Sequence, residues 1–204
     1  QLTRRQRQMC IRDRSYAGQI ITFTFPHIGN VGTNLDDLER ETTAASGIII
    51  KSDITAASNY RATQDFSCWL ASAGLTGIAG VDTRNLTRRI RDFGAMNGII
   101  SFSNKKCFDI DELTIKAQSH PSLSGMDLAS DVSSRELEKW STGTWKFGSK
   151  KNDDGFENTE RKDYHIVAID YGAKRNILRN LAQLGAKITT VPSNLSADAI
   201  LNLR

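Results

Sequence analysis

The chain has 204 residues, 39% hydrophobic side chains and a formal net charge of +4. This length allows one core of good size, or one domain with part of another. The sequence has no apolar run long enough for a transmembrane helix and no charged start leading into an apolar export segment. Its three cysteines are scattered without paired spacing, which favours a reducing, cytoplasmic location.

The net charge is concentrated at the start of the chain. Residues 1–14 hold five arginines and one aspartate, which accounts for the whole +4, while residues 15–204 are balanced. A balanced body gives no reason to expect a nucleic-acid partner, although residues 1–14 could be read as a basic arm. We interpret residues 1–14 as a non-native or disordered head, because "QMCIRDR" resembles a translated sequencing adapter and the segment has no hydrophobic period.

Residues 15–147 have the pattern of a compact α/β domain. Alternation in "GQIITFTF" predicts a strand with Ile21, Phe23 and Phe25 on one face. Three further strands are predicted in "SGIIIKSD", "LTGIAGVD" and "NGIISFS". The order of strands and helices predicts an α/β fold.

Four helices are expected in the same domain. In "TQDFSCWLASAG" Thr63 is the predicted N-cap and Gly74 the stop, and "DTRNLTRRIRDFG" carries a helical apolar stripe. That stripe consists of Leu86, Ile90 and Phe93, and Asp82 or Thr83 is expected to cap the helix. Capping-box spacing, found for Asp109 with Glu112 and for Ser133 with Glu136, predicts two more helices.

Residues 148–163 are polar and charged without an apolar period, so we expect a linker there. Residues 164–204 then contain "HIVAID", "YGAKRNILRNLAQLG" and "AKITTVP", which predict a strand, a helix and a strand. In the helix, Ile177, Leu178, Leu181 and Leu184 are expected to face inward. Such a βαβ unit should be parallel and right-handed, and it begins a doubly wound sheet that needs further strands.

The turn after "HIVAID" is one candidate binding site. Asp170 ends the strand, Gly172 lies in the turn, and Lys174 and Arg175 add positive charge at the start of a helix, where anions bind. The motif is neither GxGxxG nor a P-loop. The alternative, which we favour from the residues alone, is that Asp170 and Gly172 only shape the turn.

Other chemistry-bearing residues give weaker signals. Arg84, Arg88 and Arg91 could form a basic face for phosphate or nucleic acid, but a solvated face paired with Asp82 and Asp92 is favoured. No pair of histidines has metal-ligand spacing, so we expect no metal site. Cys68 lies beside core residues and is expected to be a buried or half-buried structural thiol, not a nucleophile.

Several long blocks occur in a distinctive order: "SYAGQIITFTFPHIGNVGTN", "SNYRATQDFSCWL", "GIAGVDTRNLTRRIRDFGAMNG", "GMDLASDVS" and "VAIDYGAKRNILRNLAQLGAKITTVP". Together they resemble the small, glutamine-hydrolysing subunit of carbamoyl-phosphate synthase, from residue 15 to residue 204. The resemblance implies an N-terminal domain over 15–147 that lacks its first strands. It also implies a truncated class I glutamine amidotransferase domain over 164–204.

The resemblance also implies a reaction. In the family a Cys–His–Glu set hydrolyses L-glutamine, and the ammonia passes to a large subunit that uses ATP, Mg and bicarbonate to make carbamoyl phosphate for arginine and pyrimidine synthesis. No catalytic residue and no cofactor is expected in this chain, because none of its cysteines matches the nucleophile motif. Ser15 matches a glutamine-holding serine, although Arg14 stands where the family has proline. Lys174 matches a basic residue near the subunit interface and the ammonia route.

Two other classes of function remain open at this point. The first domain could be a non-catalytic module that binds a partner subunit. A nucleic-acid-binding protein would rest on the basic head and on the arginines of residues 82–94, and the balanced charge of the body speaks against it.

Overall fold

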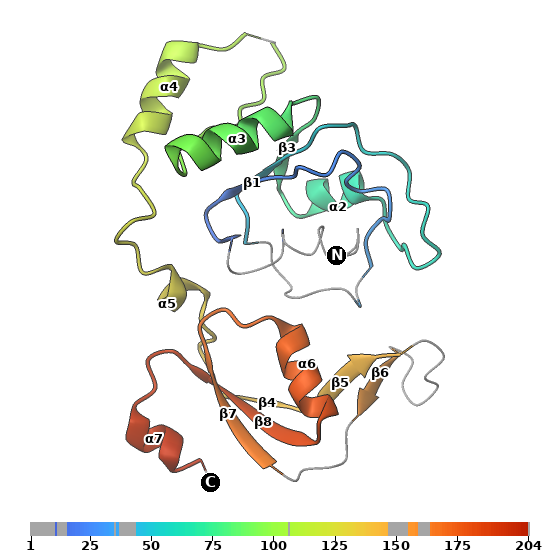
Figure 1. Ribbon diagram of the computed structural model, residues 1–204, viewed down its shortest axis with the longest axis vertical. Helices are drawn as coiled ribbons and strands as arrows, with labels where there is room; N and C mark the ends of the chain where they lie inside the picture. The colour runs from blue at the N-terminus through green and yellow to red at the C-terminus, as the bar shows by residue number, and fades with distance from the viewer. Residues whose placement is uncertain are drawn as a thin grey trace. The chain divides into compact units, whose positions relative to one another are not determined.

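The computed structural model describes residues 11, 16–34, 36, 44–105, 107–146, 155–158 and 164–203. These residues form two compact units (Figure 1). The first takes in residues 11, 16–34 and 44–126, and the second takes in residues 36 and 127–203. The second unit therefore takes in residues 127–146, which the sequence analysis included in the domain over 15–147.

A parallel sheet forms the centre of the first unit. Its strands are β1 (Ile20–Thr22), β2 (Gly47–Ile49) and β3 (Thr76–Ile78), in the order β1-β2-β3. The predicted alternation is confirmed where it matters for the core, because Ile21 and Phe23 are buried and the threonines between and after them are not. The strand predicted in "NGIISFS" is absent, and that segment has no regular structure.

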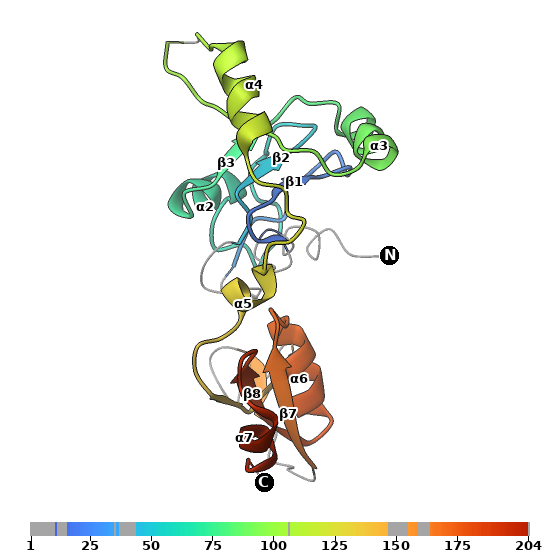
Figure 2. The same ribbon diagram turned by 90° about the vertical axis from the view of Figure 1, so that its left-hand side faces the viewer.

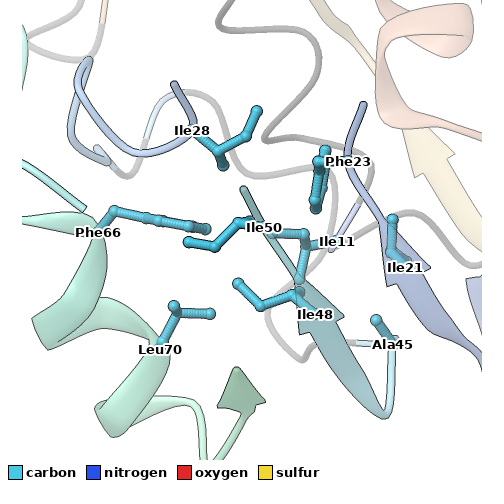
Figure 3. Close-up of a cluster of buried hydrophobic side chains, with 9 residues drawn as sticks. All are labelled: Ile11, Ile21, Phe23, Ile28, Ala45, Ile48, Ile50, Phe66 and Leu70. Atoms are coloured by element: carbon cyan, nitrogen blue, oxygen red, sulfur yellow. The ribbon is translucent and has the colours of Figure 1, made fainter. Parts of the chain in front are cut away.

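The core of the first unit lies between this sheet and a short helix, α2 (Phe66–Ser72) (Figure 3). The buried side chains are Ile11, Ile21, Phe23, Ile28, Ala45, Ile48, Ile50, Phe66 and Leu70. Ile11 is fully buried, and its carbonyl accepts a hydrogen bond from the Ala45 N–H at 3.4 Å. Ile11 thus belongs to the fold, although the sequence analysis set residues 1–14 apart from it.

The predicted cap of α2 was misplaced by two residues. The N-cap is Asp65, not Thr63, and its carboxylate accepts a hydrogen bond from the Ala57 N–H at 2.8 Å instead of capping the helix. Thr63 instead donates its hydroxyl to the Thr33 carbonyl at 3.1 Å, so its side chain serves a loop contact. Gly74 follows the helix with φ +65°, the left-handed conformation expected at that position.

Two longer helices complete the first unit: α3 (Thr83–Phe93) and α4 (Ile110–Ser119). Asp82 caps α3 by accepting from the Asn85 N–H at 3.2 Å, and Asp109 caps α4 by accepting from the Glu112 N–H at 2.9 Å. The cap at Asp109 was predicted, and Asp82 was one of the two residues expected to cap α3. The apolar stripe of α3 is only partly covered. Thr83 is the one buried residue of the helix, and Phe93, which belongs to the stripe, is 81% exposed.

The second unit begins with a five-residue helix, α5 (Leu128–Val132), capped by Asp127. The capping box predicted for Ser133 and Glu136 is wrong: Ser133 ends α5, and β4 (Glu138–Trp140) follows. Tertiary pairing outweighs the local helix signal here, because β4 joins β8 in an antiparallel pair.

The predicted βαβ unit is confirmed. Strand β7 (Tyr164–Asp170), helix α6 (Arg175–Gln183) and strand β8 (Ala186–Pro192) follow in order, and the two strands are parallel. The sheet has the order β4-β8-β7, and α6 lies along one face of the β7–β8 pair (Figure 2). A last short helix, α7 (Ala197–Leu201), follows β8.

Helix α6 buries a narrower stripe than its sequence suggested. Leu178 and Ala182 are buried, but Ile177 and Leu184 are 54% and 77% exposed. Arg179 is also buried, with its guanidinium 4.3 Å from the centre of the Phe156 ring. This contact was not predicted from the sequence.

A small antiparallel pair lies against the same helix. It consists of β5 (Thr142–Trp145) and β6 (Phe156–Asn158), so the segment expected to be a linker over 148–163 contributes a strand. Residues 147–154 and 159–163 lie outside the described part. In the part of the chain that the structure describes, no helix combines the length and apolar character needed to cross a membrane.

Candidate functional site

The turn between β7 and α6 is built around one carboxylate. Asp170 is 5% exposed, and its Oδ1 accepts hydrogen bonds from the Gly172 N–H at 3.0 Å and the Ala173 N–H at 2.9 Å. Its Oδ2 accepts from the Ser134 N–H at 2.8 Å. Gly172 has φ +91°, a conformation that favours glycine. The favoured interpretation, that Asp170 and Gly172 shape the turn, is thereby confirmed.

This arrangement bears directly on anion binding at the start of α6. The backbone N–H groups that precede the helix would attract a phosphate or carboxylate from outside. Here the carboxylate of Asp170 already receives two of them. The protein's own side chain therefore takes the place of an external anion.

Lys174 occupies the N-cap position of α6, with an exposed side chain and extended backbone angles (φ −70°, ψ 135°). Its side chain gives no cap hydrogen bond, while its carbonyl accepts from the Ile177 N–H at 2.9 Å. The position is thus one from which a basic side chain can reach a partner. Its assignment to the subunit interface and the ammonia route remains a prediction.

Ser15, predicted to hold glutamine, lies outside the described residues. The structure begins again at Tyr16, whose carbonyl accepts a hydrogen bond from the Gln19 N–H at 3.1 Å, just before β1. The role of Ser15 remains a prediction from the resemblance.

The described cysteines show no catalytic setting. Cys68 and Cys107 are free thiols with exposed side chains, and neither has a histidine partner within the described ranges. Burial of Cys68 was predicted wrongly, because α2 turns Phe66 and Leu70 into the core and leaves Cys68 outside. Among the residues described, no group of three or more His, Cys, Asp or Glu side chains could hold a metal ion. Cys10 is not among the described residues.

The arginines of α3 are exposed along the helix. The predicted pairing of Arg84, Arg88 and Arg91 with Asp82 and Asp92 is absent, since no ion pair joins any of these five side chains to another described residue. Asp82 instead caps the helix.

An open hollow of about 430 Å³ lies beside the sheet of the first unit. Its lining is mainly aliphatic, from β2, β3 and α2, with Asp53 and Ser67 as polar members. Such a surface can accept an apolar group, and its polar side chains are one carboxylate and one hydroxyl.

At the C-terminal end of α6, Gln183 and Glu157 belong to a second group of polar contacts. The Gln183 side chain donates to Glu157 Oε2 at 2.9 Å, and Lys146 Nζ lies 2.8 Å from Glu157 Oε1. These two contacts, that of Lys146 first, hold the pKa of Glu157 below its ordinary value of 4.5. These contacts join the residue that follows β5 to β6 and to the end of α6, and their role is structural.

The geometry thus defines an α/β protein of two units, with a well-built βα turn and no assembled nucleophile among the residues it describes. Comparison with known proteins shows which proteins the chain is similar to. Residues 6–100 match a sequence model described as the carbamoyl-phosphate synthase small chain, CPSase domain. The matched region begins within residues 1–14 and covers the whole sheet of the first unit.

Relatives extend the similarity along the chain. The carbamoyl phosphate synthase small chain of Brucella anthropi is 45% identical over 195 residues, which is 94% of this chain and 47% of the relative. That of Bradyrhizobium diazoefficiens is 45% identical over 198 residues, 95% of this chain and 49% of the relative. Over almost all of its length, the chain is therefore similar to carbamoyl phosphate synthase small chains. It spans about half the length of the curated relatives it matches.

Proposed function

We propose that this chain is part of the glutamine-hydrolysing subunit of carbamoyl-phosphate synthase, a ligase. The observation that carries the proposal is 45% identity to small chains over 94% of the sequence. The parent enzyme would hydrolyse glutamine and pass ammonia to a large subunit. That subunit would supply the ATP- and Mg-dependent steps with bicarbonate, serving arginine and pyrimidine synthesis in the cytoplasm.

Amide hydrolysis requires a set of groups that the 204-residue chain would have to supply in order to hydrolyse glutamine by itself. A thiolate must attack the amide, an imidazole must move the proton, and backbone N–H groups must stabilise the oxyanion. Cys68 and Cys107 are exposed and lack a histidine partner within the described ranges, and Cys10 does not match the family's nucleophile motif. We therefore expect this chain to hold part of the scaffold and to be inactive alone.

Within this scaffold, Ser15 would contact glutamine, and Lys174 would lie near the large subunit and the ammonia route. The exposure of Lys174 at the start of α6 supports an interface role. A second candidate function is a non-catalytic subunit-binding module, which is supported by the exposed apolar side chains of residues 93–115.

The test measures glutamate release from glutamine by the purified chain, alone and with the large chain encoded in the same genome. We expect binding to the large chain without glutamate release. Turnover by the chain alone would contradict the expected inactivity. Absence of binding would contradict the subunit assignment.

A further inference from the structure

Asn97 is followed by Gly98, and every other asparagine of the sequence precedes a residue that has a side chain. In an Asn-Gly pair, the backbone nitrogen of the glycine can approach the side-chain carbonyl carbon of the asparagine, because no Cβ obstructs it. Attack at that carbon displaces the side-chain amide as ammonia, which is one reason why asparagine is a labile residue. The pair is therefore a chemically reactive position wherever the fold leaves its backbone free.

The structure leaves this backbone free. Residues 94–100, which follow α3, have no regular structure, and Asn97 and Gly98 are both exposed. Among the residues that the structure describes, no group accepts a hydrogen bond from the Gly98 N–H. The Gly98 nitrogen can therefore lose its proton to a base in the solvent and act as a nucleophile, whereas the amide nitrogens inside α3 and α4 are held by helical hydrogen bonds.

The Asn97 side chain holds a contact that this reaction would remove. Its Nδ2 donates to the carbonyl of His120, the C-cap residue of α4, at 2.5 Å. None of the residues of α4 is buried, and both views show the helix standing clear of the three-stranded sheet (Figures 1 and 2). A single exposed hydrogen bond contributes little to stability, so local opening at the end of α4 releases Asn97 for reaction.

We propose that Asn97 is a site of spontaneous deamidation, and that its conversion detaches the end of α4 from the segment after α3. The Gly98 nitrogen bonds to Asn97 Cγ, the bond from Cγ to Nδ2 breaks, and ammonia leaves with the proton that the Gly98 nitrogen gave up. Water then opens the cyclic imide at either of its carbonyls, which gives aspartate or isoaspartate. Water is consumed and ammonia is released, and no group is oxidised or reduced.

The product cannot keep the contact with α4. An ionised carboxylate has no proton to donate, and its oxygens would face the carbonyl oxygen of His120. In the isoaspartate product the backbone also runs through Cβ, which displaces the side group further. This inference uses residues of the first unit alone and is independent of the proposed function.

Asn104 provides an internal control within the same chain. It is exposed and lies in a turn outside the helices and strands, as Asn97 lies outside them. It precedes Lys105, whose side chain hinders the attack and whose N–H donates to Ser103 Oγ at 3.3 Å. Asn104 should therefore keep its amide under conditions in which Asn97 loses it.

The first experiment incubates the purified 204-residue chain in mildly alkaline buffer and follows both asparagines by mass spectrometry of peptides. Asn97 should convert at least about tenfold faster than Asn104, and Gly98→Ala should slow the conversion of Asn97 at least about tenfold. A Cβ at position 98 would lie 4.0 Å from Ile20 Cδ1, an ordinary contact distance, so Gly98→Ala should fold with unchanged circular dichroism. Conversion of Asn97 no faster than that of Asn104, in a chain with native circular dichroism, would overturn the proposed site.

The second experiment tests the detachment of α4. Asn97→Asp reproduces the product and should speed hydrogen exchange of the amides in the last turn of α4 at least about threefold, while amides in α2 stay unchanged. Asn104→Asp makes the same change of charge away from His120 and should leave α4 unaffected. Equal exchange of the α4 amides in the two variants would overturn the proposed detachment.

Discussion

Helices α3 and α6 carry similar apolar stripes, yet they bury very different surfaces. In α6, Leu178, Arg179 and Ala182 are all buried, between the sheet on one side and β5 and β6 on the other. In α3 only Thr83 is buried, and the helix ends on the exposed ring of Phe93. An apolar stripe thus indicates that a helix needs a partner surface, but the stripe does not say whether the same chain provides it.

The starts of the two helices differ in the same way. At the start of α3, the Asp82 carboxylate accepts one hydrogen bond, from the Asn85 N–H, as is usual for a helix cap. Asp170 receives three N–H groups, one of them from Ser134, which is 36 residues away in sequence. The start of α6 is therefore fixed to the rest of its unit, whereas the start of α3 is held by its own first turn.

The largest expected effect comes from the packed side chains. Leu178→Ala should destabilise the second unit by about 3 kcal/mol, because it opens a cavity in a buried site. Leu86→Ala, at a half-buried site of α3, should cost the first unit about 1 kcal/mol. Urea unfolding of fluorotryptophan-labelled chain would measure both, since Trp69 reports on the first unit and Trp140 and Trp145 on the second. Equal losses would remove the contrast between the two helices.

The second-largest effects on stability are expected at the starts of α6 and α3. Asp170→Ala should destabilise the second unit by about 2 kcal/mol, because it leaves three half-buried N–H groups without their acceptor. Asp82→Ala should cost the first unit about 1 kcal/mol, the usual effect of losing a cap. The same labelled tryptophans provide the measurement. A smaller loss for Asp170→Ala than for Asp82→Ala would show that the Asp170 contacts add nothing to the turn.

A smaller effect should come from the arginine inside α6. Phe156→Leu keeps an apolar side chain but removes the ring under Arg179, and it should cost about 1 kcal/mol. Arg88→Ala, on the exposed side of α3, should change stability by less than about 0.5 kcal/mol. Equal unfolding midpoints for these two variants would argue against a stabilising contact between Arg179 and the ring.

The smallest expected effect is a pH dependence at the end of α6. The pKa of Glu157 is lowered by Lys146 and Gln183, so the folded unit favours the charged carboxylate. This contribution is complete above the ordinary pKa of 4.5 and is lost as the pH falls through the lowered folded pKa. Carboxyl-carbon NMR should show Glu157 titrating below 4.5. Glu157→Gln should flatten the acid side of the stability profile of the second unit.

The parts of the fold that follow from local sequence were predictable. The βαβ unit, the caps Asp82 and Asp109, and the stop at Gly74 each depend on residues close together in the chain. The turn role of Asp170 followed in the same way. Its third bond, to Ser134, did not, because only the folded unit brings the two segments together.

The errors share a physical origin in contacts that are distant in sequence. Ser133 and Glu136 have the spacing of a capping box, but the residues that follow them form strand β4, because they pair with β8. Ile177 and Leu184 continue the apolar stripe of α6, yet the sheet beneath the helix covers only its centre. At the candidate site, the sequence predicted that Lys174 lies at the start of a helix. The roles of Lys174 and Ser15 could not be predicted from local sequence, because they involve other molecules.

The pairing of β4 with β8 has a consequence for the order in which the protein is made. The Glu138 carbonyl accepts a hydrogen bond from the hydroxyl of Thr190, which is 52 residues later in the chain. At about 5–20 residues per second, a ribosome delivers that partner roughly 3–10 s after β4 has been synthesised. During this interval β4 is a nascent strand without its neighbour, whereas β7, α6 and β8 emerge together and can form at once. The second unit should therefore assemble around its βαβ unit, and β4 should join last although it is synthesised first.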